Sequence, residues 1–399
     1  MTNGKMIIAK NPFTVGHGKV PPFLAGREDE KHKLESLLGQ TVAGKVVTRN
    51  VHIFAPRGMG KTSLLEEVRG ELRLLRDGNA GKAAIAMTAV NSMRTVDEAR
   101  RTLVNDIGVS MKEALTPARV VAELKIVSAE WSRTERSWSS VCGSLAASCR
   151  SRPVVFMVDE AHRLSPEVLA AIMDDIEMIR QKDGPIVGVF AGKPALIDRI
   201  ARAGVSYEER SVYISLDLLD ENSSAAAITH PLSRSAMKIS PEALDMVVKN
   251  AQGYPTYLQY WGSALWNRCI KKAESNVIDG GDVMAVKPEI EEQKKQAYQS
   301  RFGTWSSADA NLLMSLTRRL EKIGEVNRPR LEEMIREELR RQRRGGSDHV
   351  DRIFREMIDT DYVWSPLGTA NYKAALPSYF GFILSQEKEM VSQRKNEHD

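Results

Sequence analysis

Short apolar runs alternate with helix-like segments over roughly the first half of the chain. Apolar runs bounded by turn residues are typical of buried strands, and apolar residues three or four positions apart are typical of helices. The expected strands are 51–55, 83–90, 154–158, 186–190 and 212–216. The expected helices between and around them are 27–38, 61–75, 96–107 and 166–180. This alternation predicts a parallel, doubly wound sheet that binds its ligand at the carboxyl ends of the strands.

The pattern changes after residue 219, where strand signals stop. Helical spacing alone continues to residue 300, and residues 301–385 predict three helices followed by a short hairpin. We therefore expect five parts along the chain. They are an extended lead-in at 1–25, an α/β domain at 26–219, a helical domain at 220–300, a helix-and-hairpin domain at 301–385 and a polar tail at 386–399.

Composition and charge exclude some classes of protein. Of the 399 residues, 42% are apolar and 27% are charged, which is ordinary for globular domains and excludes a wholly disordered or collagen-like chain. The formal net charge of +5 is too small to predict nucleic-acid binding by itself. The three cysteines, Cys142, Cys149 and Cys269, lack metal-ligand spacing and are expected to be buried thiols. With no apolar leader or membrane-spanning stretch in view, we expect a soluble, cytoplasmic protein.

The first expected strand leads into a phosphate-binding sequence. Ala55-Pro56-Arg57-Gly58-Met59-Gly60-Lys61-Thr62 matches GxxxxGK[ST] except that alanine opens it. In such a loop the backbone N–H groups converge on the β-phosphate, the lysine reaches the β- and γ-phosphates, and the threonine hydroxyl binds Mg²⁺. Ala55 fits if its backbone avoids positive φ. A solvated turn is the alternative, but the flanking strand and helix favour nucleotide binding.

An acidic pair follows the strand expected at 154–158. Asp159 would hold Mg²⁺ through water, and Glu160 would act as general base toward the attacking water. Acidic pairs of this kind are common after strands and often have no function. The upstream phosphate-binding sequence favours the catalytic interpretation here.

These motifs resemble the AAA+ ATPases, in the branch shared by origin-recognition initiators and the STAND signalling ATPases. The resemblance covers about residues 20–385 and includes a "GRE" box at 24–28, a Walker B strand at 154–162 and a sensor-one strand at 186–194. Gly253-Tyr254-Pro255 is similar to the STAND lid motif GxP. The nucleotide-binding residues that the resemblance implies are Gly26, Arg27, Pro56, Arg57, Gly58, Met59, Gly60, Lys61, Thr62, Ser63 and Pro255.

The chain departs from the family pattern at three points. The sensor-one position falls near 191–193, where Lys193 puts a basic residue in place of a neutral one. The position of the lid arginine of initiators falls near Thr256, so a threonine stands in place of that arginine. The long repeats of STAND proteins are missing from this sequence. The resemblance therefore implies the initiator plan. Its fold class is α/β, a P-loop parallel αβα sandwich followed by an all-α lid and a C-terminal winged helix.

Several side chains leave two interpretations open. Arg210 stands where AAA+ subunits place an arginine finger, although it could equally cap the neighbourhood of Glu208 and Glu209. His162 beside the acidic pair has no second metal ligand nearby, so a supporting role is favoured over a metal site. The aromatic series 254–266 is expected to be lid core rather than a base-stacking platform. The arginine run 336–344 would contact DNA phosphate or form a solvated, ion-paired face.

The expected function is an ATP- and Mg²⁺-dependent ATPase that hydrolyses slowly and serves as a conformational or assembly switch. We expect a homo-oligomer with a protein partner and no membrane association. In the first interpretation it is a DNA-associated, initiator-like loader, and in the second a STAND-like signalling switch without DNA binding. The DNA contacts expected from a winged helix are His349, Arg352, Arg355, Arg343, Arg344 and Lys373. The nearly balanced charge of residues 300–399 predicts that this binding is weak.

Overall fold

The structure is a computed structural model that describes residues 10–16, 20–74, 83–113, 138–204, 207, 209–235, 237–272 and 276–386. The chain forms two compact units. We call residues 27–55 and 61–216 the sheet unit, and residues 1–26, 56–60 and 217–399 the helical unit. The start of the expected lead-in, Glu208 and the expected tail beyond residue 386 lie outside the described residues.

The sheet unit contains five parallel strands in the order β2-β3-β4-β1-β5. All five expected strands are present, with ends that differ by one or two residues. They are β1 (Asn50–Phe54), β2 (Ala84–Ala89), β3 (Val154–Asp159), β4 (Ile186–Gly192) and β5 (Ser211–Ser215). Because the strands are parallel, all their carboxyl ends lie at one edge of the sheet, and β1 lies between β4 and β5 there.

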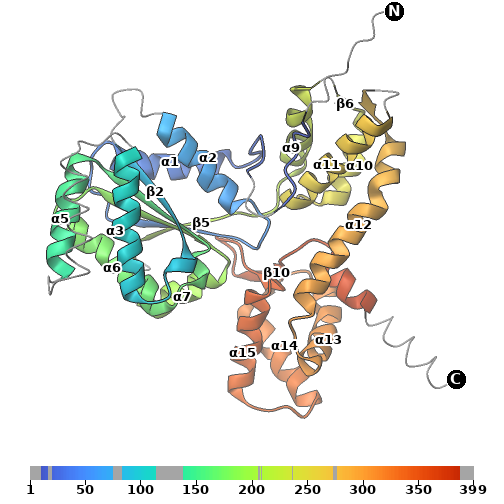
Figure 1. Cartoon of the computed structure of the whole chain (residues 1–399). Helices are drawn as coiled ribbons and strands as arrows, with labels where there is room; N and C mark the ends of the chain where they lie inside the picture. The colour runs from blue at the N-terminus through green and yellow to red at the C-terminus, as the bar shows by residue number, and fades with distance from the viewer. Residues whose placement is uncertain are drawn as a thin grey trace, which may run out of the picture. The chain divides into compact units, whose positions relative to one another are not determined.

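Helices cover both faces of this sheet (Figure 1). They are α1 (Glu28–Val42), α2 (Lys61–Leu74), α3 (Val96–Glu113), α5 (Trp138–Ser151), α6 (Pro166–Arg180) and α7 (Ala195–Ala203). Helices α1 and α2 pack on one face, and the other four share a core with the opposite face. The expected helix 166–180 is confirmed in full: Ser165 accepts a hydrogen bond from the Val168 N–H at its start, and proline occupies the first turn.

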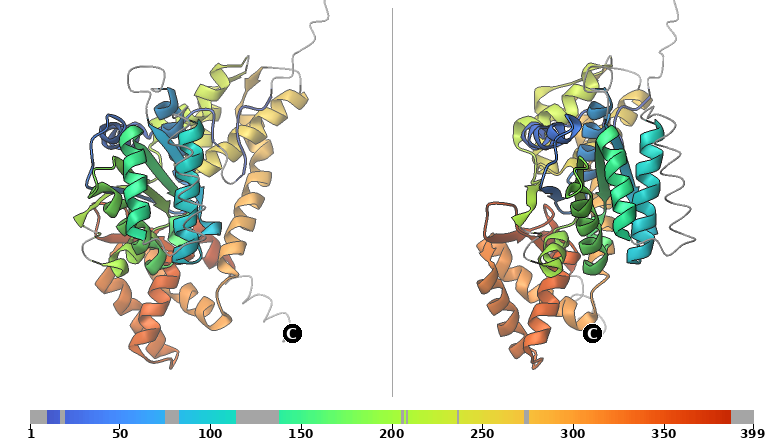
Figure 2. Two further views of the ribbon diagram at one scale, coloured as in Figure 1. Left: turned by 60° about the vertical axis from the view of Figure 1, so that its left-hand side comes forward. Right: turned by 90° about the vertical axis from the view of Figure 1, so that its left-hand side faces the viewer.

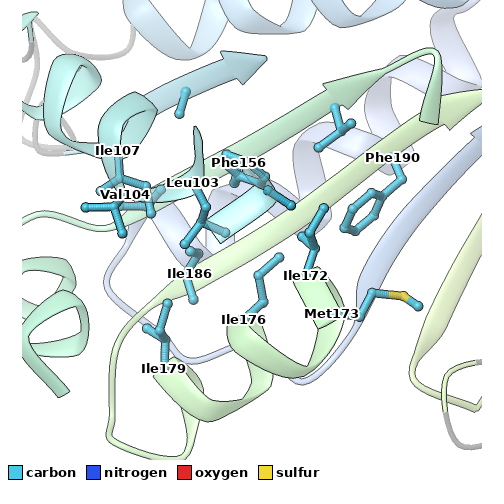
Figure 3. Close-up of a cluster of buried hydrophobic side chains, with 14 of the residues drawn as sticks. Leu103, Val104, Ile107, Phe156, Ile172, Met173, Ile176, Ile179, Ile186 and Phe190 are labelled. Atoms are coloured by element: carbon cyan, nitrogen blue, oxygen red, sulfur yellow. The ribbon is translucent and has the colours of Figure 1, made fainter. Parts of the chain in front are cut away.

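The strands alternate their side chains between the two faces. In β3, Phe156 points into the core shared with α3 and α6, where it lies among Ile172 and Ile176 of α6 (Figure 3). Ile186 and Phe190 of β4 join the same core, and all five side chains are at most 1% exposed. Each such side chain contributes about 1.5–3 kcal/mol by leaving water. Side chains of β3, β4 and α6 thus share one buried core.

Residues 221–302 of the helical unit correspond to the expected lid, and we call this part the lid. Its helices are α9 (Glu221–Ser233), α10 (Pro241–Ala251), α11 (Pro255–Lys272) and α12 (Gly280–Phe302). The expectation of an all-α lid is wrong in one respect, because β6 (Lys238–Ile239) and β7 (Val277–Ile278) pair in parallel. Two-residue strands are too short to produce an alternating sequence pattern, so only the pairing identifies them.

The long helix α12 connects the lid to the C-terminal part of the same unit (Figures 1 and 2). Three helices and a hairpin were expected there and are present. The elements are α13 (Ser307–Ile323), β8 (Val326–Asn327), α14 (Arg328–Arg341), α15 (Ser347–Asp359), β9 (Val363–Trp364) and β10 (Asn371–Ala374). The additional strand β8 pairs with β10, giving the antiparallel order β8-β10-β9. Among the described residues, none of the helices is long and apolar enough to cross a membrane.

The lead-in is anchored on the lid rather than merely extended. The Asn11 side chain donates hydrogen bonds to the backbone and hydroxyl oxygens of Ser263, and the Thr14 N–H donates to Gln259. Phe13 packs so closely on α11 that a Cβ at Gly262 would lie 2.3 Å from its ring. The lead-in therefore belongs to the lid.

Candidate functional site

The expected phosphate-binding loop connects β1 directly to α2 at the carboxyl edge of the sheet. Gly58 and Gly60 have φ values of +81° and +93°, a left-handed region that favours glycine. The φ of Ala55 lies outside this region, so alanine fits at this position, as the sequence analysis required. Its N–H donates to the carbonyl of Gly192 at 3.2 Å, which ties the start of the loop to the end of β4. The loop therefore has a backbone that its sequence can adopt.

The side chains of the loop differ in their surroundings. Lys61 is only 6% exposed, and its Nζ donates to the carbonyl oxygen of Ala55 at 2.8 Å. Through this hydrogen bond, the ammonium group of Lys61 contacts the first residue of the loop that is expected to surround the phosphates. Met59 is fully buried and Ser63 is 9% exposed, whereas Arg57 is exposed. Met59 therefore contributes its backbone to the loop and its side chain to packing.

Thr62 and Asp159 meet at the edge of the sheet. The Thr62 hydroxyl donates to Oδ2 of Asp159 at 2.6 Å, and Oδ1 of Asp159 accepts the N–H of Glu160 at 2.8 Å. Asp159 ends β3, and Thr62 lies in the first turn of α2. The sequence placed these two residues at one metal site, and the structure brings them into contact.

The pair fits Mg²⁺ by its chemistry. A hydroxyl and a carboxylate are hard oxygen ligands, and Mg²⁺ at a phosphate site takes few protein ligands and keeps several waters. Within the described part of the chain, no cluster of three histidine, cysteine or acidic side chains could hold a metal by itself. Thr62 and Asp159 are thus the residues that would hold Mg²⁺ together with nucleotide phosphates.

Glu160 has an unusual backbone for a glutamate. Its φ of 56° places it in the left-handed region, where a residue with a side chain costs of order 1–3 kcal/mol and where functional residues often cluster. A short 3₁₀ turn (Ala161–Arg163) follows it. Within this turn, Nε2 of His162 lies 3.8 Å from Oε2 of Glu160, and its backbone packs on Gly192. His162 thus faces the expected general base, which agrees with a supporting role.

Lys193 follows β4 directly, at the position that the resemblance assigns to sensor one. It is 8% exposed, so this basic side chain is buried at the same edge of the sheet as Lys61 and Asp159. Arg27 of the expected "GRE" box is 4% exposed and pairs with Glu30 at 3.5 Å. Gly26 belongs to the helical unit, where a Cβ would lie 2.4 Å from the Ser223 oxygen.

The lid motif contacts the phosphate-binding loop inside the helical unit. The Tyr254 hydroxyl donates to the carbonyl of Arg57 at 2.6 Å, and the Thr256 hydroxyl donates to the carbonyl of Gly58 at 3.0 Å. Pro255, which the sequence placed near the nucleotide, lies between them at the start of α11. The sequence analysis missed both hydroxyls. It assigned Tyr254 to the core of the lid, and it considered Thr256 only as the position at which initiators have an arginine.

Arg210 lies at the opposite edge of the sheet. It directly precedes β5, whereas the phosphate-binding loop follows β1, and the two strands run in parallel. At 3.3 Å per residue, a five-residue strand separates the two edges by roughly 16 Å. Arg210 pairs with Glu177 of α6 at 3.5 Å, a partner different from the glutamates next to it in sequence. Within one chain, Arg210 therefore does not reach the loop.

Comparison with known proteins extends these observations. Residues 24–180 match the AAA ATPase domain family. No curated protein sequence matches the chain. Among solved structures, the ORC2 protein of Aeropyrum pernix in ADPNP–ADP complexes is 12% identical with a TM-score of 0.57, covering 94% of this chain and 98% of that one. A Walker-type ATPase of Pyrococcus abyssi is 13% identical with a TM-score of 0.57, covering 90% of this chain and 96% of that one.

The two kinds of comparison cover different parts of the chain. The AAA ATPase domain match includes the phosphate-binding loop and the Asp159-Glu160 pair, and it ends with α6. The structural likeness extends over both units, but at this identity it shows a shared fold and nothing more. Residues 24–180 are thus similar to the AAA ATPase domain family, and the fold of the chain is similar to that of the ORC2 protein.

Proposed function

We propose that this protein binds ATP with Mg²⁺ and hydrolyses it slowly, and that the cycle acts as a conformational and assembly switch. The contact between Thr62 and Asp159, beside the buried ammonium group of Lys61, carries the proposal. The AAA ATPase domain match over the same residues supports it. The ORC2 protein, solved in ADPNP–ADP complexes, supports nucleotide binding by this fold.

In the proposed mechanism the chain supplies binding, charge and a base. The N–H groups of residues 58–62 and the N-terminus of α2 surround the phosphates, and Lys61 neutralises their charge. Thr62 and Asp159 would hold Mg²⁺, which would supply positive charge against the charge that develops during transfer. The Glu160 carboxylate accepts a proton from the attacking water and orients it, while His162 lies beside that carboxylate.

We propose that Arg210 acts on the ATP that is bound to a second copy of the chain. Its place at the far edge of its own sheet, with 54% of the side chain exposed, supports action in trans on a neighbour's γ-phosphate. A homo-oligomer in which each subunit completes its neighbour's site follows from this role. The ion pair with Glu177 would break when Arg210 enters that site.

We also propose that the C-terminal part of the chain binds DNA. The order helix, strand, helix, helix, strand, strand over residues 307–374 supports a winged helix, in which α15 is the recognition helix. Three of the six expected contacts are engaged elsewhere. Asp309 binds both Arg344 and Arg352, at 2.7 and 3.1 Å. Lys373 pairs with Asp217 at 2.8 Å. His349, Arg355 and Arg343 are exposed, which supports weak binding by few contacts.

Two titrations test these proposals. Labelled ATP should bind the wild-type protein and not Lys61→Ala, which lacks the lysine ammonium group at the phosphates.

With ATP and low salt, a labelled DNA duplex should bind the wild type. Combining Arg343→Glu with Arg355→Glu should weaken DNA binding and flatten its salt dependence. Lys322→Glu, at the exposed end of α13, is the matched control. Absence of DNA binding by the wild type would favour a switch that acts on protein partners.

A further inference from the structure

Two lid hydroxyls hold the phosphate-binding loop by its carbonyl groups. Tyr254 binds the carbonyl of Arg57 at 2.6 Å, and Thr256 binds the next carbonyl, that of Gly58, at 3.0 Å. In a trans peptide the C=O and the following N–H lie in one plane and point in opposite directions. Fixing the carbonyls of residues 57 and 58 therefore fixes the direction of the N–H groups of Gly58 and Met59. These N–H groups belong to the set that surrounds phosphate in such a loop.

The fit between the lid and the loop depends on the absence of a side chain at Gly58. A Cβ there would lie 2.1 Å from the Tyr254 hydroxyl oxygen and 2.5 Å from Oγ1 of Thr256. Gly58 thus serves two purposes, its positive φ and the close approach of the lid. The contact is direct and leaves no room for a water between the groups.

Tyr254 is held rigidly and keeps its proton. It is 3% exposed, and burial raises the pKa of its hydroxyl to about 12, so it remains a donor at neutral pH. Its ring packs edge-on against Tyr257, with 4.4 Å between ring centroids. A preorganised donor of this kind loses little freedom when it holds the loop.

The same aromatic cluster reaches the C-terminal part of the unit. The Tyr257 hydroxyl donates to the Tyr298 hydroxyl of α12 at 2.7 Å, and Tyr298 donates to the carbonyl of Pro377 at 2.5 Å. A second hydrogen bond, from Ser378 to the Gln252 side chain at 2.7 Å, joins the same two regions. Contacts of side chains thus run without a gap from residues 377–378 to the phosphate-binding loop.

We infer that Tyr254 and Thr256 are positioning residues for ATP, and that Tyr257 and Tyr298 connect them to the C-terminal part. This inference rests on the proposed ATP binding and adds to it how affinity is set. Loss of either hydroxyl frees one peptide plane of the loop, so its N–H group no longer points steadily at phosphate. A change at residues 377–378 reaches the loop by the same contacts.

ATP affinity of conservative variants tests the positioning role. Tyr254→Phe and Thr256→Val remove one hydroxyl each with little change in shape, and each should raise the Kd for ATP by about three- to tenfold, as expected for one hydrogen bond. Tyr260→Phe on the same helix is the matched control and should bind as the wild type does. If the wild type binds ATP and Lys61→Ala does not, but Tyr254→Phe and Thr256→Val bind as tightly as the wild type, the positioning role is wrong. If the wild type itself fails to bind ATP, the proposed function is what fails.

A double-variant cycle tests the connection. Tyr298→Phe should weaken ATP binding by about two- to threefold, and adding it to Tyr254→Phe should cause no further loss, since the two changes interrupt one path. Tyr379→Phe is the control, because that hydroxyl has no hydrogen-bond partner among the described residues while its ring stacks on Tyr298. Thermal melting of each variant confirms that it is folded. Wild-type affinity of Tyr298→Phe, or losses that simply add, would overturn the connection.

Discussion

The hydroxyl of Thr62 lies 2.6 Å from Oδ2 of Asp159, although the two residues are 97 positions apart. One belongs to the first turn of α2 and the other ends β3. This hydrogen bond places a hydroxyl and a carboxylate together at the carboxyl edge of the sheet, beside the loop that would hold the phosphates. The proposed Mg²⁺ site depends on this contact.

Thr62→Val should raise the Mg²⁺ concentration needed for half-maximal ATPase activity by about tenfold or more, because an oxygen ligand is replaced by a methyl group. The measurement is ATP hydrolysis over a range of Mg²⁺ concentrations. Thr102→Val, at a half-buried position of α3, serves as the control. An unchanged Mg²⁺ dependence in Thr62→Val would mean that the hydroxyl is not a ligand.

His52 should make the protein sensitive to mild acid. It is fully buried in β1 between the rings of Phe190 and Tyr213, and in the described structure neither ring nitrogen has a hydrogen-bond partner. Burial lowers its pKa to about 3, from an ordinary value near 6.5. The unfolded chain binds the proton more readily, so this group's contribution to stability is complete above pH 6.5 and is lost as the pH falls toward 3.

Between pH 8 and pH 5, the wild type should therefore lose about 2 kcal/mol of unfolding free energy more than His52→Leu does. Urea denaturation of both proteins at several pH values measures this difference. Parallel stability profiles for the two proteins would show that His52 does not cause the acid sensitivity.

Arg210→Ala should lower ATPase activity per subunit by at least about tenfold and leave ATP affinity nearly unchanged, because we propose that the arginine acts on a neighbour's nucleotide. Mixing it with Glu160→Gln should restore some activity, since mixed interfaces combine an intact arginine with an intact base. Arg202→Ala, which removes an exposed arginine paired with Asp198, is the control. Activity per subunit that does not vary with protein concentration would argue against action in trans.

The sequence predicted the sheet unit well because its core strands are continuous apolar runs. Helix α6 was predicted to its last residue, since Ser165 and Pro166 mark its start and apolar spacing marks its length. Helix α5 was not predicted, because small residues such as Ser140, Gly143 and Ala147 weaken its apolar periodicity. In the structure α5 packs against α6.

The parts of the site made by tertiary contacts could not be predicted. Tyr254 has the spacing of a core aromatic residue, and only its position shows that its hydroxyl holds the carbonyl of Arg57. Arg352 has the position of a DNA-reading residue on α15, but Asp309, 43 residues earlier, binds it. In both cases the partner is distant in sequence, and the sequence pattern carries no information about it.

The proposed mechanism holds one bound ATP by Lys61 and hydrolyses it with Glu160 as base. Its most direct test is ATP binding and turnover measured side by side on the wild type and Glu160→Gln. We expect Glu160→Gln to bind ATP with wild-type affinity and to lose hydrolysis by about a hundredfold or more, because the amide cannot accept the proton of the attacking water. Hydrolysis by Glu160→Gln at the wild-type rate would contradict the proposed mechanism.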